Sequence, residues 1–132
     1  MRRLVVLVAV LAGCPAVDLG DTPSDIGTCY PAKGEAYFES TIWPSYINNT
    51  KRSCVPSGGC HDQNSSSGGR LHFITMPPDL PANYRLVQPD LDCTFPTASL
   101  LYTKPCGIDP HQGGPIFTCP SDPEAQLFLA WF

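Results

Sequence analysis

Seven cysteines constrain this 132-residue chain more than any other feature of its sequence. They lie at positions 14, 29, 54, 60, 93, 106 and 119. Fifteen prolines and eleven glycines predict a loop-rich fold, and a small domain of this kind gains only modest stability from its core. We therefore expect disulfide crosslinks. Because the number of cysteines is odd, at least one of them is not paired in a disulfide within the chain.

The first cysteine closes a segment with the features of an export signal. Arg2 and Arg3 precede an apolar run at residues 4–11, which is too short for a permanent membrane helix and is typical of a signal peptide. The run ends in Leu-Ala-Gly-Cys, which resembles the lipobox of bacterial lipoproteins. This resemblance implies a signal peptide at residues 1–13, lipid on Cys14 and attachment to the membrane. Because Pro15 is not the Asp that favours inner-membrane retention, we expect the outer membrane, on its periplasmic or surface face.

If lipid takes Cys14, the other six cysteines can be accounted for in two ways. Three disulfides use all six, and the sequence does not give their pairing. Alternatively, Cys54 and Cys60 become thioethers of a haem, and two disulfides form among the remaining four, Cys29, Cys93, Cys106 and Cys119. Neither accounting leaves a free thiol, so catalysis by a cysteine nucleophile is not expected.

The charge of the mature chain excludes one class of partner. Without Arg2 and Arg3 it has 6 basic and 12 acidic residues, a formal charge of −6. An acidic domain of this size is not expected to bind nucleic acid or an anionic lipid surface. Residues 14–27 are polar and rich in turn formers, which predicts a tether. Residues 28–132 then form one small, mainly α-helical, disulfide-stapled domain.

Apolar spacing predicts a helix over residues 35–51, and Pro44 inside it should kink or restart the helix. Residues 71–75 can form a short extended piece. Trp43 and Trp131 are expected in the core.

Three further helical segments are predicted in the second half of the chain. A helical turn is expected at residues 83–87, and a short helix at residues 97–104 with Thr97 as its cap. Ser121 and Glu124 have the spacing of a capping box, which predicts a last helix beginning there. The architecture is therefore a few short helices joined by long loops.

Six segments follow one another in an order that resembles a known family. They are residues 37–49, which are helical, 54–61 (CVPSGGCH), 68–71 (GGRL), 99–105 (SLLYTKP), 111–114 (HQGG) and 128–132 (FLAWF). In this order they resemble the small cytochrome c-like domains of secreted planctomycete and myxobacterial proteins. The resemblance covers about residues 36–132 and implies a cytochrome c-like fold.

This family resemblance implies a covalently bound c-type haem. In the usual C-x-x-C-H signal, two thiols bond the haem vinyl groups and the histidine ligates the iron. Here Cys54, Cys60 and His61 would have these roles, with an atypical C-x5-C-H spacing. Gly58 and Gly59 would let the longer loop bulge outward, because glycine tolerates unusual backbone angles.

A six-coordinate haem needs a second axial ligand. His111 is the first candidate, because Gly113 and Gly114 beside it permit close approach of the backbone. Met76 is the second, since a thioether raises the potential relative to a second histidine. His72 is the third, with a structural role more expected for it.

The function implied is one-electron transfer by a membrane-anchored lipoprotein that is not an enzyme and whose redox partner is an unidentified protein. The alternative is a haem-less binding or structural module of the same fold, held by three disulfides. A copper site is a further alternative, because imidazole and thioether suit copper. Its ligands would be His61, His72, Met76 and His111. No G-x-S-x-G context suggests a hydrolase.

Overall fold

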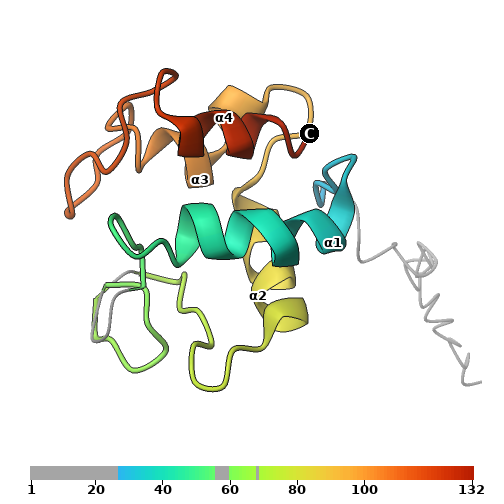
Figure 1. The fold of residues 1–132 in the computed structure, drawn as a ribbon. Helices are drawn as coiled ribbons and strands as arrows, with labels where there is room; N and C mark the ends of the chain where they lie inside the picture. Colours follow the sequence, from blue (N-terminus) through green and yellow to red (C-terminus); the bar gives the residue numbers. More distant parts are fainter. Residues whose placement is uncertain (1–26, 56–59, 68) are drawn as a thin grey trace, which may run out of the picture.

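The computed structural model describes residues 27–55, 60–67 and 69–132. The expected signal peptide, the lipidation site Cys14, Gly58 and Gly59 lie outside the described residues, as does nearly all of the expected tether. Figure 1 shows short helices joined by long loops, and the described residues contain no strand. The elements are α1 (Gly34–Tyr37), η1 (Phe38–Ile47), α2 (Leu80–Val87), η2 (Gln88–Asp90), η3 (Pro96–Ala98), α3 (Leu100–Thr103) and α4 (Pro123–Leu129). The predicted small, loop-rich architecture is confirmed at this level.

The first predicted helix is formed by α1 and η1 together, which end at Ile47 rather than at residue 51. η1 has the wide turn of a π-helix, and the N–H of Asn48 donates to the carbonyl oxygen of Trp43 at 2.7 Å, five residues back. A proline clashes with the narrower α-helical turn and has no N–H to donate. The wider turn accommodates Pro44, so the helix continues past it instead of restarting.

The core is formed where η1 packs against α4 and α2 (Figure 1). Aromatic rings from these elements contact one another in it. Phe38, Tyr46, Phe128 and Trp131 are completely buried. The ring centres of Tyr46 and Phe128 are 5.2 Å apart, and those of Phe38 and Trp131 are 5.7 Å apart. Trp43 is also buried, so the core positions predicted for both tryptophans are confirmed.

The helix starts differ from the predictions, and of α2, α3 and α4 only α2 has a side-chain cap. α2 begins at Leu80, where the Asp79 carboxylate accepts from the N–H of Ala82 at 3.0 Å. The prediction of Thr97 as a cap is wrong, because it lies within η3. The residue at the start of α3 is Ser99, and its hydroxyl accepts from the N–H of Asp92 at 2.9 Å.

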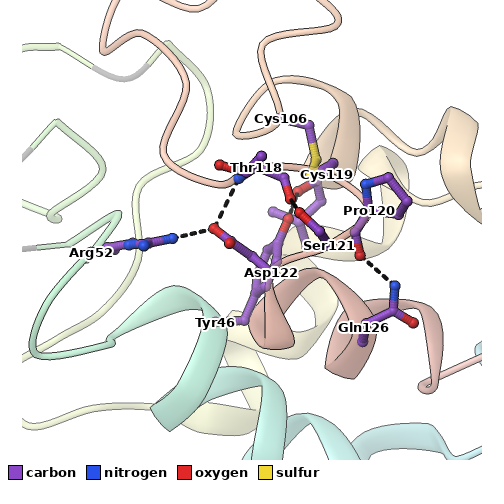
Figure 2. Close-up of a disulfide and its surroundings, with 10 residues drawn as sticks. Tyr46, Arg52, Cys106, Thr118, Cys119, Pro120, Ser121, Asp122 and Gln126 are labelled. Carbon is purple, nitrogen blue, oxygen red and sulfur yellow. Dashed lines mark hydrogen bonds and ion pairs between the residues drawn. A yellow bond between two sulfur atoms is a disulfide. The ribbon is translucent and has the colours of Figure 1, made fainter.

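The predicted capping box at the start of α4 is also wrong. The N-cap position is Asp122, and the hydroxyl of Ser121 donates to the carbonyl oxygen of Thr118 at 2.9 Å. The Asp122 carboxylate accepts from the N–H of Thr118 at 2.9 Å and pairs with Arg52, as Figure 2 shows. The side chain of Asp122 therefore fastens the preceding loop instead of capping its own helix.

Two disulfides crosslink the loops. Cys29 pairs with Cys93 across 64 residues of sequence, and Cys106 pairs with Cys119 across 13 (Figure 2). These are the four cysteines that are expected to form disulfides if Cys54 and Cys60 bind haem. No helix in the described part of the chain is long and apolar enough to cross a membrane.

Candidate functional site

The segment that begins at Cys60 is held beside residues 71–75 by backbone contacts. The N–H of Phe73 donates to the carbonyl oxygen of His61 at 2.8 Å, and Asp62 forms an isolated bridge with Phe73. The extended piece predicted at residues 71–75 is therefore present only as single bridges. The N–H of His61 in turn lies 3.3 Å from the carbonyl oxygen of Cys54, so both ends of the C-x5-C-H segment meet at this histidine.

The side chain of Asp62 stabilises the turn that follows His61 through two hydrogen bonds. Its carboxylate accepts from the hydroxyl of Thr75 at 2.5 Å and from the N–H of Asn64 at 2.9 Å. The hydrogen bond from Thr75 is the main reason that the pKa of Asp62 lies below its ordinary value. The carboxylate is thus an integral part of the loop, and it stabilises the position of the neighbouring histidine.

The imidazole of His61 is oriented by the backbone of Leu71. Its Nδ1 lies 2.9 Å from the carbonyl oxygen of Leu71, and because a carbonyl only accepts, Nδ1 carries the proton. The Nε2 atom makes no hydrogen bond with any described residue. Burial lowers the pKa of His61 from its ordinary 6.5, and the charges of His111 and Lys104 act in the same direction. Both effects favour the neutral ring with an available Nε2 lone pair, which is the form that binds metals.

The imidazole of His111 is held in the same way from the other side. Its Nδ1 lies 2.9 Å from the carbonyl oxygen of Gly114, which leaves Nε2 without a hydrogen bond in the described structure. A Cβ atom at Gly113 would lie 3.2 Å from Cε1 of this ring, so glycine allows the backbone to pass close beside it. Gly114 has a φ of +71°, a conformation that also favours glycine. Both glycines therefore shape the loop around the histidine.

The imidazoles of His61 and His111 are stacked beside one another. Their ring centres are 6.0 Å apart and their planes are within 14° of parallel. Two imidazoles bound to opposite sides of one first-row metal ion, each through a nitrogen at about 2 Å, have ring centres roughly 6 Å apart. The ring-centre separation of His61 and His111 therefore equals that of two ligands on opposite sides of one metal, and ligation would require the stacked rings to turn until both Nε2 lone pairs, which lie in the ring planes, point at it.

Two adjoining hollows surround this pair. The inner hollow has a volume of about 160 Å³ and the outer hollow about 730 Å³, and both are lined by His61, Gly69, Lys104 and His111. The larger volume is within the range of cofactor and ligand sites in proteins. The remaining lining of the inner hollow is mainly apolar, and includes Cys54, Leu71, Phe73, Leu100, Leu101 and Pro105.

The two cysteines of the C-x5-C-H segment line different hollows. Cys54 is buried and lines the inner hollow, whereas Cys60 is exposed and lines the outer one. Burial raises the pKa of the Cys54 thiol to about 12. Neither cysteine is in a disulfide. The structure therefore has both thiols beside the two imidazoles.

The other two ligand candidates are not brought to the hollows. Met76 is 82% exposed and lines neither of them. Both ring nitrogens of His72 contact backbone carbonyl oxygens, Nδ1 that of Asp62 at 3.1 Å and Nε2 that of Gly69 at 2.6 Å. His72 is thus structural, and the four ligands of the alternative copper site do not gather.

Sequence reasoning missed three charged residues of the inner hollow. Arg70, Asp90 and Lys104 line it, and Arg70 pairs with Asp90. Burial raises the pKa of Asp90, although the charges of Arg70 and Lys104 oppose this. No spacing or motif in the sequence relates the three residues, because the loops that bring them together are set by the fold.

The arrangement suits only some metals. Among the described residues there is no group of three or more His, Cys, Asp or Glu side chains that could hold a metal ion. Zinc and copper sites in proteins usually take three or four protein ligands. Two opposed imidazoles instead suit a metal whose other positions are filled by a planar macrocycle. No family model, curated protein or solved structure matches the chain.

Proposed function

We propose that this protein is a c-type haem protein that transfers single electrons, with His61 and His111 as the axial ligands. The observation that carries the proposal is the pair of imidazoles with ring centres 6.0 Å apart, each with Nδ1 hydrogen-bonded and Nε2 available. Haem supplies the remaining four nitrogens and the one-electron chemistry. The neighbouring hollow of about 730 Å³ gives such a group room.

The cysteine accounting supports covalent attachment. Four cysteines form two disulfides, and the two left over are Cys54 and Cys60, which line the hollows beside His61. In c-type attachment each thiol adds across a vinyl group to give a thioether, with no oxidant needed. The pairing of Cys54 with Cys60 that a haem-less module would need is absent from the structure.

The residues around the two imidazoles would adjust the properties of a bound haem and would not react themselves. The carbonyl oxygens of Leu71 and Gly114 fix the tautomer and orientation of the imidazoles and make them stronger ligands. Phe73 and Leu101 line the inner hollow with apolar surface, which limits the access of water. Such a site passes electrons between partner proteins and needs no substrate pocket, so we propose no enzymatic activity.

The test is expression of the mature chain with cytochrome c maturation genes, followed by a visible spectrum and an intact mass. We expect a red protein with a low-spin spectrum and a mass increased by one haem. A colourless protein with three disulfides and no added mass would overturn the proposal and leave the haem-less module. Substitution His111→Ala should shift the Soret band and convert the iron to high spin, whereas Met76→Ala should change neither, because Met76 lines neither hollow.

We also propose that the protein is held on the membrane by lipid on Cys14. The support is the signal-like segment and the lipobox at residues 11–14. The test is expression of the full chain in a bacterial host, with Cys14→Ser as the variant. We expect the wild-type chain in the membrane fraction with a mass that includes acyl chains, and the variant uncleaved and without lipid. Equal masses of acyl-free chain from both would contradict the anchor.

A further inference from the structure

The inner hollow has positive charge at its edge, although the chain as a whole is acidic. Lys104 lines both hollows, and Arg70 lines the inner one. These are two of the six basic residues that remain in the mature chain. A ligand with a negative charge would therefore meet cations here that are scarce elsewhere on the molecule.

Arg70 and Lys104 differ in whether a carboxylate already neutralises their charge. The Arg70 guanidinium forms an ion pair with the carboxylate of Asp90, whose side chain is only 9% exposed. Lys104 forms no ion pair with any described residue and is exposed at the edge of the hollows. The three groups together carry one net positive charge when Asp90 is ionised, and that charge belongs to the lysine.

We propose that Lys104 binds a carboxylate of the group held between His61 and His111, that is, a haem propionate. This inference rests on the proposed function, because the carboxylate arrives with the haem. A flexible ammonium group at the shared edge of both hollows can reach an acidic group that points toward solvent. The same carboxylate would lie in the field of Asp90, which repels it and keeps Arg70 occupied.

Two substitutions should therefore act in opposite directions. Lys104→Gln removes the cation that binds the propionate, whereas Asp90→Asn removes the competitor and frees Arg70 to donate to the same group. A merely structural role for Lys104 would not give this opposition, because loss of packing weakens every contact alike. The covalent thioethers keep the haem in each variant, so all of them can be compared as holoproteins.

The experiment measures the propionate bending band in the resonance Raman spectrum of the holoprotein, which reports hydrogen bonding to the propionates directly. We expect Lys104→Gln to shift this band toward the value of an unbonded propionate, Lys104→Arg to retain the wild-type position, and Asp90→Asn to shift it the opposite way. The Soret band should not move in any of them, because the axial ligands are unchanged. The matched control is Arg85→Gln, which removes the same charge from an exposed position on α2 that lines neither hollow.

The outcomes separate this inference from the proposed function. A wild-type chain that forms no holoprotein would overturn both. A holoprotein with bis-histidine ligation whose propionate band is the same in Lys104→Gln and the wild type would overturn the lysine contact alone. An equal shift in Arg85→Gln would also overturn it, because the effect would then come from total charge.

Discussion

The side of the molecule where η1 meets α4 and the side where His61 faces His111 are ordered by different forces. On the first side, aromatic rings such as Tyr46 and Trp131 are completely buried and pack at ring-centre distances of 5 to 6 Å. On the second, the imidazoles are only partly buried, and single hydrogen bonds to carbonyl oxygens set their orientation. Burial therefore stabilises the fold, whereas directional bonds align the candidate ligands. Substitutions should separate the two properties.

The largest expected effect is on the packed side. Trp131→Ala removes a completely buried ring that packs on Phe38 and Phe128 and whose Nε1 donates to the carbonyl oxygen of Gly34 at 2.8 Å. We expect it to lower the free energy of unfolding by about 4 kcal/mol. Urea denaturation followed by circular dichroism measures this.

The control for this substitution is Phe95→Ala, which removes a ring that is 65% exposed and should change the stability by less than about 0.5 kcal/mol. If the proposed haem is bound, the folded fraction of Trp131→Ala should keep the wild-type Soret position, because Trp131 lines neither hollow. A variant as stable as the wild type would show that the aromatic core contributes less than its burial implies.

The next effect should reach both sides. Cys106 and Cys119 bracket the loop that carries His111, so replacing both with alanine frees this loop in addition to removing a crosslink. We expect a loss of about 3 kcal/mol in the free energy of unfolding. If the proposed haem is bound, we also expect a fraction of high-spin iron in the holoprotein, since the loop would hold His111 less firmly. Electron paramagnetic resonance measures that fraction.

The comparison for this loop is the double substitution of Cys29 and Cys93. It should also lower stability, but the iron should remain fully low-spin, because neither residue lies in a loop that carries a ligand. Equal spin-state changes in the two double variants would mean that general loosening, and not the His111 loop, controls ligation.

A smaller effect is expected where the two sides meet. The hydroxyl of Tyr46, in the core, donates to the carbonyl oxygen of Leu101, which lines the inner hollow, at 2.8 Å. Tyr46→Phe should cost about 1 kcal/mol, because it leaves this buried carbonyl without its donor. Tyr102→Phe is the control, since its hydroxyl makes no hydrogen bond with the described residues. Thermal unfolding of both variants would show no difference if the Tyr46 bond contributes nothing.

The smallest effect depends on pH. The backbone N–H of Thr118, and to a lesser extent Arg52, hold the pKa of Asp122 below its ordinary value of 3.8. The folded chain thus binds this proton less readily than the unfolded chain, so the stabilisation is complete above the ordinary pKa and is lost as the pH falls through the folded pKa. Melting temperatures between about pH 5 and pH 2 should fall more steeply for the wild type than for Asp122→Asn.

Arg52→Gln distinguishes the two partners of this carboxylate. Because the bond from Thr118 is the larger cause, Arg52→Gln should keep most of the acid dependence of the wild type. A variant whose melting temperature falls as little with pH as that of Asp122→Asn would instead assign the effect to the ion pair.

The sequence predicted the buried aromatic rings and the presence of the helices better than it predicted where the helices begin and end. Trp43 and Trp131 are buried because large apolar rings have few other places in a domain this small. Ser121 and Asp122 show why the ends are harder: either can cap a helix, and the choice is decided by where Thr118 lies in the folded chain. Local spacing carries no information on that contact.

Some residues of the candidate site could likewise be predicted from local sequence patterns, and others could not. Adjacent Cys60 and His61 and the glycines beside His111 are visible as local patterns, and the structure brings the two histidines together. The carbonyl oxygen of Leu71 that contacts His61 and the cation of Lys104 have no such pattern, since the first comes from the backbone of a loop and the second follows the C-terminal end of α3. The haem itself stays a prediction.

The unequal burial of the two remaining thiols has a consequence for export. Disulfide exchange requires a thiolate, and a thiol whose pKa is about 12 keeps its proton at neutral pH. In an oxidising compartment, burial of Cys54 in the folded chain would therefore keep this thiol unpaired while the other cysteines form disulfides. Cys60, which is exposed, can instead exchange with a foreign disulfide such as oxidised glutathione, which gives a mixed disulfide and releases one thiol. The same burial would slow the addition of the Cys54 thiol to a vinyl group, so the proposed haem would have to be attached before the chain closes around this residue.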